Sequence, residues 1–319
     1  MIYICAVFRL WKMNDYTKNA IVGNAACFTA YLIFGFNIVC CKNIANDGHI
    51  SPMSLFFIRS VGALVLFWIV SLFSGRKEKV AWNDMWKIAI ASLLGLFLTQ
   101  FSFLKAITMT TAVDASVMSL LSPIMAMVVA AIALKDRITA HGVIGLTVSL
   151  AGVLFIVLNS VTTSSGAETT SFAGVLLMMV NALSFASYVG IFKPLIQRYS
   201  VVTFMKWMFV FSTLYALPFS GGVMDVQYSE IPPEIAWQIF FVVVGATFTS
   251  YFLIPVGQKR LKPMLVCMYS YVQPVIAMCI SLAVELDTIT WAKGLAALLV
   301  FAGVGIVNFS PRRRTSTVK

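Results

Sequence analysis

The chain has 319 residues, of which 60% are hydrophobic and only 11% are charged. A typical soluble chain is about 45–50% apolar and about 25% charged, so a soluble fold of this length would expose a large apolar surface to water. The net charge of +11 would suggest nucleic-acid binding in a soluble protein, but here the charges lie in short segments between apolar runs. We therefore expect an integral membrane protein with the lipid bilayer, and no nucleic acid, as its partner.

Apolar runs follow one another along almost the whole chain. An α-helix needs about 20 apolar residues to cross a hydrocarbon core of about 30 Å. The sequence predicts ten spanning helices, at about residues 20–41, 53–73, 87–107, 113–134, 140–158, 172–193, 202–219, 235–256, 264–284 and 291–309. We expect an all-α protein, with residues 1–19 as an N-terminal segment and residues 310–319 as a basic tail.

The loop charges predict an orientation. Cytoplasmic loops of membrane proteins carry an excess of Lys and Arg. If the N-terminus is cytoplasmic, 18 of the 23 Lys and Arg residues fall on the same side, around residues 9–18, 76–87, 135–137, 193–198, 259–262 and 312–319. The loops at 159–171 and 220–234 contain neither. We expect both termini in the cytoplasm and, because the loops are short, a bacterial inner membrane.

The start of the chain and its Cys and His residues indicate no further site. Met1–Phe8 is apolar but too short to span a bilayer, and Met13 precedes a polar segment, so Met13 is an alternative start. The six cysteines and two histidines lack metal-ligand spacing. We expect neither a metal nor a cofactor.

Two halves of the chain repeat one pattern at a fixed offset of 151 residues. Residues 119–153 and their counterparts share ten identities without a gap, and Gly23 with Gly174 and Lys42 with Lys193 fit the same offset. Each copy holds five predicted spans, so the second must enter the membrane from the opposite face. The sequence therefore predicts two inverted five-helix repeats, at 20–158 and 172–309, a device that recurs in transporters.

The repeated segments carry a family resemblance. The run Ser122-Pro123 … Asp136 … Gly145 … Ala151-Gly152-Val153, and its counterpart from Gln273-Pro274 through Asp287 to Ala302-Gly303-Val304, resembles the end of an EamA repeat. From about residue 20 to 309 the chain is similar to ten-helix members of the drug/metabolite transporter superfamily. That resemblance implies a small-molecule carrier. It places Asp136 and Asp287 at the acidic position of each repeat, where glutamate is commoner.

Pro123 and Pro274 are the candidates for helix breaks or gates. Proline inside a helix removes one N–H and displaces the carbonyl four residues back, here those of Ser119 and Ser270. In lipid a released carbonyl needs a partner in the protein or in cavity water. Matching interrupted helices in two halves indicate a central binding site, although the prolines could equally be kinks that help packing.

Arg59 is the candidate for binding an anionic group of the substrate. It lies several residues inside the second predicted helix, where an Arg costs about 2.5–3.5 kcal/mol on insertion scales. A guanidinium suits a carboxylate. The alternatives are that Arg59 extends to the outer interface or pairs with Asp114.

Further polar residues within the spans could bind substrate or join helices. Buried amides and hydroxyls in lipid need hydrogen-bond partners. These candidates are Asn181, Gln273, Gln100, Ser122, Tyr31 and Tyr188.

We expect a secondary carrier that works by alternating access and exports amino acids or related metabolites. The alternatives are a multidrug or nucleotide-sugar carrier of the same superfamily, or a membrane-embedded enzyme, for which no catalytic cluster is evident. Protons are a candidate coupling ion, with Asp114 as the nearest carboxylate to the pathway. The small residues of the fifth and tenth runs would suit packing within a monomer or contact in a homodimer.

Overall fold

The computed structural model describes residues 15–74, 78–133, 170–261 and 263–283, with single helical positions between 140 and 155 and between 291 and 306. The described part of the first half contains α2 (Asp15–Asp47), α3 (Pro52–Phe73), α4 (Trp82–Ser92), η1 (Leu93–Leu98), α5 (Thr99–Ile107), α6 (Ala112–Met118), η2 (Ser119–Leu121) and α7 (Ser122–Ala133). Here η denotes a π-helix or a 3₁₀-helix.

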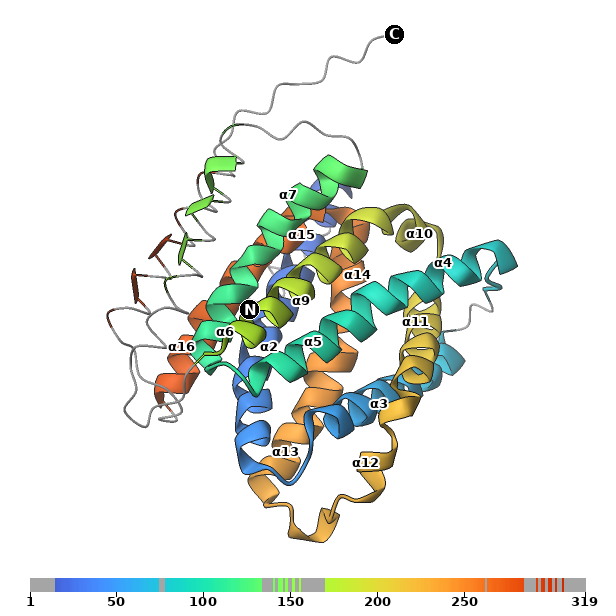
Figure 1. The fold of residues 1–319 in the computed structure, drawn as a ribbon. Coiled ribbons are helices and arrows are strands. Elements are labelled where there is room, and N and C mark those ends of the chain that lie inside the picture. Colours follow the sequence, from blue (N-terminus) through green and yellow to red (C-terminus); the bar gives the residue numbers. More distant parts are fainter. Residues whose placement is uncertain are drawn as a thin grey trace, which may run out of the picture.

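The described part of the second half repeats this order, with the short elements α10, η3, α12 and η4 in addition. It contains α9 (Phe172–Ile191), α10 (Lys193–Arg198), α11 (Val201–Ala216), η3 (Leu217–Phe219), α12 (Gly221–Met224), η4 (Tyr228–Glu230), α13 (Pro233–Phe241), η5 (Val242–Thr249), α14 (Ser250–Arg260), α15 (Pro263–Met268), η6 (Tyr269–Tyr271) and α16 (Val272–Ala283). Figure 1 shows these helices as one bundle.

The bundle has the composition of a membrane domain. Among the described residues, six helices are long and apolar enough to cross a membrane, and Ala112–Ala126 and Leu265–Ala277 are shorter apolar helices. Large apolar side chains such as Phe28, Val65 and Phe73 are exposed, as a surface that faces lipid requires. The protein is therefore a multi-pass α-helical membrane protein, as predicted.

Several predictions fall on residues that the structure does not describe. These are Met13, Asp136, Asp287, the tail at 310–319 and most of the fifth and tenth predicted spans. Where the structure does describe a predicted span, the boundaries differ by a few residues. The first helix continues to Asp47 instead of ending at 41, because Lys42 is buried (5% exposed) and donates from Nζ to the carbonyl of Ile107 at 3.4 Å.

Contacts at the helix ends show that the two halves run in opposite senses. The Lys42 bond places the ends of α2 and α5 at one face of the bundle, here named the Met109 face. Gly23, near the start of α2, lies against Arg260 and Leu261 at the end of α14, at the opposite or Leu261 face. The third helix of the first half therefore ends at one face and that of the second half at the other.

The second half repeats these contacts with the faces exchanged. Gly174, near the start of α9, lies against Met109 and Thr110, the residues 151 positions before Arg260 and Leu261. Lys193, just beyond α9, donates from Nζ to the carbonyl of Leu261. In each half a lysine in the last turns of the first helix or just beyond it thus binds a carbonyl at the end of the third, where the negative end of the helix dipole favours a cation.

Interrupted helices also match between the halves. The π-helices η1 and η5 occupy the middle of the third helix in each half, and the 3₁₀-helices η2 and η6 occupy the fourth. Pro123 and Pro274 are the second and third residues after these 3₁₀ turns, so the two prolines lie beside matching irregular segments. Their role as helix breaks or gates stays a prediction.

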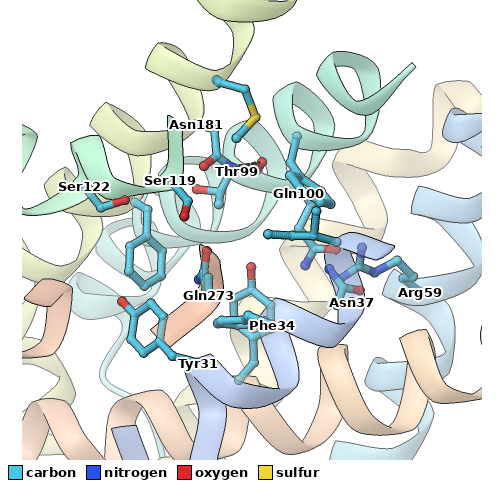
Figure 2. Close-up of a pocket in the computed structure, with 15 residues that line it drawn as sticks. Tyr31, Phe34, Asn37, Arg59, Thr99, Gln100, Ser119, Ser122, Asn181 and Gln273 are labelled. Carbon is cyan, nitrogen blue, oxygen red and sulfur yellow. Dashed lines mark hydrogen bonds between the residues drawn. The ribbon is translucent and has the colours of Figure 1, made fainter. Parts of the chain in front are cut away.

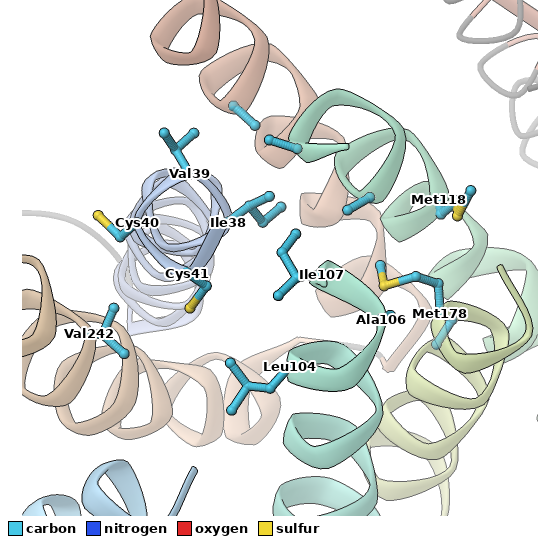
Figure 3. Packing of buried hydrophobic residues seen from close by; sticks show 14 of the residues in the cluster. Ile38, Val39, Cys40, Cys41, Leu104, Ala106, Ile107, Met118, Met178 and Val242 are labelled. Carbon is cyan, nitrogen blue, oxygen red and sulfur yellow. The ribbon is translucent and has the colours of Figure 1, made fainter. Parts of the chain in front are cut away.

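The first helix of each half packs against the third and fourth helices of the other half, so the halves form one core. Figure 3 shows one part of it, where Ile38 of α2 faces Ile107 of α5, with Leu104 of α5 and Met178 of α9 nearby. Cys40 and Cys41 are buried there as free thiols and serve as small packing residues.

A polar network joins the halves at the Leu261 face. The Asp84 carboxylate, 2% exposed, accepts hydrogen bonds from Lys87 Nζ (2.9 Å), Arg198 Nη1 (2.5 Å) and the Tyr199 hydroxyl (2.8 Å). Lys259 Nζ donates to the Tyr199 carbonyl. This Asp84 network connects the start of the third helix with the segment between α10 and α11 of the other half.

Replacing Gly174 tests the close contact between the halves. A Cβ at Gly174 would lie 2.7 Å from Thr110 Cγ2 and 3.0 Å from the Met109 carbonyl oxygen. We expect Gly174→Ala to destabilise the protein by about 1–3 kcal/mol through overpacking, measured as a lower unfolding midpoint in detergent. Gly190→Ala on the same helix is the control, because its Cβ would meet no atom closer than 3.5 Å. Equal midpoints for the two variants would contradict the packing described.

Candidate functional site

A pocket lies inside the bundle between the two halves. Its empty volume is about 620 Å³, counting the part that opens to solvent. Figure 2 shows the described residues that line it, which are Tyr31, Phe34, Asn37, Ile38, Arg59, Thr99, Gln100, Phe103, Ser119, Ser122, Met178, Asn181, Phe185, Tyr251 and Gln273. They come from the first, second, third and fourth helices of the first half and from the first, third and fourth helices of the second half.

Six of the residues singled out in the sequence line this pocket. They are Tyr31, Arg59, Gln100, Ser122, Asn181 and Gln273. Tyr188 does not belong with them, because its ring packs against Gly95 and its hydroxyl donates to Gln258 Oε1 at 3.2 Å. Pro123 and Pro274 lie next to Ser122 and Gln273 in the chain and are absent from the described lining. They lie in the first turns of the α-helices that follow the two 3₁₀ turns.

Arg59 is held as a buried cation at the pocket wall. Its side chain is 2% exposed. Nε donates to Thr247 Oγ1 at 2.8 Å, and Nη1 lies 3.8 Å from Cys41 Sγ. Thr247 in turn donates to the Val242 carbonyl at 2.7 Å, so its hydroxyl is fixed as an acceptor for Arg59. The π-helix η5 therefore supplies the anchor that orients the guanidinium.

Both alternative interpretations of Arg59 are wrong for this structure. Its burial excludes extension to the interface. It forms no ion pair with any carboxylate of the described residues, and Asp114 instead accepts a hydrogen bond from Thr170 Oγ1 at 2.5 Å. A buried guanidinium without a carboxylate partner is an unfavourable arrangement, which the binding of an anion would relieve.

The π-helix η1 sets the opposite wall. A π-turn leaves carbonyls without their usual intrahelical partners, and side chains satisfy two of them. Thr99 Oγ1 donates to the Leu94 carbonyl at 2.7 Å, and Asn181 Nδ2 donates to the Thr99 carbonyl at 2.6 Å. Asn181 thus joins α9 to α5, while its side chain still lines the pocket. The two expectations for Asn181, that it joins helices and that it lines the pocket, are therefore compatible.

Some of the residues that line the pocket occupy matching positions in the two halves. Three pairs of lining residues stand 151 positions apart: Phe34 with Phe185, Gln100 with Tyr251, and Ser122 with Gln273. Phe34, Asn37, Thr99 and Phe103 had not been singled out in the sequence. A comparison of positions 151 residues apart, near the polar candidates, would have found Phe34, because the residue at the matching position, Phe185, is also a phenylalanine. No such signal identifies Asn37 or Thr99.

Several polar atoms of the wall have no partner within the described residues. The Tyr31 hydroxyl is buried without a hydrogen bond. The Gln100 amide nitrogen and oxygen are also buried without one. Unpaired buried polar groups are costly, so these atoms are available to a ligand. Among the described residues no group of three His, Cys, Asp or Glu could hold a metal ion. The wall can thus bind an anion and several hydrogen-bonding groups.

Comparison with known proteins gives the family. The model of the EamA-like transporter family matches residues 21–158 and again residues 172–309. The chain is 26% identical over 291 residues to the "uncharacterized inner membrane transporter YicL" of Salmonella typhimurium, which covers 89% of this chain and 94% of that protein. It is 25% identical over 203 residues to an "uncharacterized transporter" of Archaeoglobus fulgidus, covering 63% of this chain and 68% of the relative.

A protein of known crystal structure has the same fold. It superposes with a TM-score of 0.60 at 15% identity, covering 91% of this chain and 96% of its own. The two family matches extend over most of the chain, and both enclose helices that line the pocket. The chain therefore belongs to the EamA-like transporter family, within the drug/metabolite transporter superfamily.

Proposed function

We propose that the protein is a secondary carrier that exports amino acids or related metabolites by alternating access. The observation that carries this proposal is the buried Arg59, held at the wall of a pocket between two oppositely directed halves and paired with no carboxylate of the described residues. Arg is suited to binding a carboxylate through two parallel hydrogen bonds.

The Asp84 network supports alternating access. Two halves related by inversion can exchange conformations, and the two states then differ in which face is closed. The network occupies the Leu261 face, where the loop charges predict the cytoplasm. It cannot form at the other face, because the residue 151 positions after Asp84 is the apolar Ile235 and the residue 151 positions before Arg198 is Asp47. We propose that this network holds the Leu261 face closed, by contacts that the other face lacks.

We also propose a bacterial inner membrane as the location, with both termini in the cytoplasm. The printed name of the Salmonella relative places that protein in an inner membrane. The charge distribution of the loops supports the orientation.

A multidrug carrier is the second candidate. The rings of Phe34, Phe103 and Phe185 at the pocket favour it, since apolar aromatic walls accept varied ligands. A nucleotide-sugar carrier is less well supported, because Arg59 is the single cation among the described lining residues and several would be needed to bind a diphosphate.

Removing the charge of Arg59 tests the export proposal. We expect cells that overproduce the wild-type protein to enrich an anionic or zwitterionic metabolite in the medium. Arg59→Gln should reduce the rate of enrichment by at least about tenfold, since losing one partner of a buried charge pair weakens binding by about 2–5 kcal/mol. Untargeted mass spectrometry of the medium measures this. Lys105→Gln is the control, because it removes one exposed charge outside the pocket. Equal enrichment by Arg59→Gln would remove Arg59 from the proposal, and no enrichment by wild type would contradict export.

Neutralising Asp84 tests the closed face. We expect Asp84→Asn to weaken its bonds to Lys87 and Arg198 and to shift the protein toward a state open at the Leu261 face. Spin labels at the exposed positions Lys79 and Gln197 should then report a population with longer distances. Glu234→Gln, an exposed acid at the start of α13 on the other face, should leave the distances unchanged. An unchanged distribution in Asp84→Asn would show that the network does not hold this face closed.

A further inference from the structure

The two ends of the pocket differ in chemistry. Figure 2 shows Arg59, Asn37 and Gln100 together on one side and Ser119, Ser122 and Tyr31 on the other. Contacts connect the first group, because Cys41 Sγ lies 3.8 Å from Arg59 Nη1 and donates to Asn37 Oδ1 at 3.5 Å. The second group offers hydroxyls without charge. The pocket therefore has a cationic end and a neutral, hydrogen-bonding end.

The wall between these ends is largely apolar. The rings of Phe34 and Tyr251 meet edge to face, with centroids 5.7 Å apart, and Tyr31 meets Phe34 at 5.8 Å. Phe103, Phe185 and Met178 complete this part of the described lining. A ligand that reaches both ends would bury a flat or apolar middle section against these rings.

Acidic side chains are missing from the described lining. Asp114 is engaged with Thr170, and Asp84 is engaged in the network at the Leu261 face. An ammonium group in the pocket would thus have only neutral acceptors. In an α-amino acid it would also stand close to the guanidinium that binds the carboxylate, where two like charges repel strongly in a medium of low dielectric constant.

We infer that the pocket selects a small organic monoanion, with a carboxylate at Arg59 and an uncharged hydroxyl or amide at the Ser119–Ser122 end, over a zwitterion or a cation. This inference rests on the proposed function and narrows its substrates to the related metabolites without a free ammonium group, so that free α-amino acids are excluded. Among the described lining residues Arg59 is the one charged side chain and none is acidic, so together they carry a charge of +1, which a monoanion neutralises. A zwitterion would also place its carboxylate at Arg59, but its ammonium would remain as a desolvated cation and leave the filled site with a charge of +1.

A matched series of four probes tests the inference by direct binding. The probes are 3-(4-hydroxyphenyl)propanoate, its neutral amide 3-(4-hydroxyphenyl)propanamide, zwitterionic tyrosine and cationic tyramine, which share one phenol and differ in charge. Binding is measured by calorimetry on the full-length protein in lipid nanodiscs. We expect the propanoate to bind wild type at least about tenfold more tightly than the other three, a difference equal to about 1.4 kcal/mol.

Variants assign the preference to Arg59. Arg59→Gln should abolish the preference for the propanoate over its amide, and Lys105→Gln should keep it. Thr247→Val retains the charge but removes the acceptor for Arg59 Nε, so it should reduce the preference without abolishing it. This variant also keeps the test valid if Arg59→Gln unfolds.

The outcomes separate this inference from the proposed function. Tyrosine bound as tightly as the propanoate, a preference retained in Arg59→Gln, or no binding by any probe to folded wild type would each overturn the inference. Export is measured independently, as loss of each probe from cells that were loaded with it. If the propanoate binds but is not exported, the inferred selectivity of the site stands and the proposed export is contradicted. Export of tyrosine at the higher rate would support an exporter and overturn the selectivity.

Discussion

A backbone carbonyl released inside a lipid bilayer has no water to bind, and this constraint determines where the helices of this protein depart from α geometry. At the π-helices η1 and η5, side-chain hydroxyls of the same helix supply partners for backbone carbonyls. Thr99 and Ser250, 151 positions apart, donate to the carbonyls of Leu94 and Gly245, also 151 apart. The irregular turns therefore face the interior of the bundle. They occur in both halves because the two halves repeat one pattern.

These interruptions produce the pocket and its charge. The turn in η5 brings Thr247 to Arg59, and the turn in η1 exposes the Thr99 carbonyl to Asn181. Just after the two turns, Gln100 and Tyr251 enter the wall from opposite halves. A regular helix would place its polar groups within its own hydrogen bonds and leave little for a ligand. The same local change thus satisfies the backbone and presents side chains to a central cavity.

The sequence predicted the all-α membrane fold because hydropathy reflects the bilayer directly. The count of ten spans and the orientation from loop charge stay predictions. Arg59, Gln100 and Asn181 were identified as pocket residues because a polar group inside a span is costly and needs a reason. Tyr188 was expected at the pocket, but the sequence does not show which side of its helix a tyrosine occupies. Its packing on Gly95 also could not be predicted from the sequence. The π-helices were not predicted, since their positions depend on side-chain acceptors brought together only in the folded bundle. Asn37 was missed because nothing in the sequence shows which side of the first helix faces inward.

The central claim is that the pocket between the inverted halves is open alternately to the two faces of the membrane. The most direct measurement is the reaction of Ser122→Cys with a membrane-impermeant thiol reagent, added from each side of sealed vesicles in turn. Ser116→Cys is the matched control, because Ser116 is fully buried one and a half turns away and does not line the pocket. The unmodified protein gives the background from its native cysteines. The account predicts that Ser122→Cys reacts from both sides and Ser116→Cys from neither. Reaction of Ser122→Cys from one side only, or from neither, would contradict it.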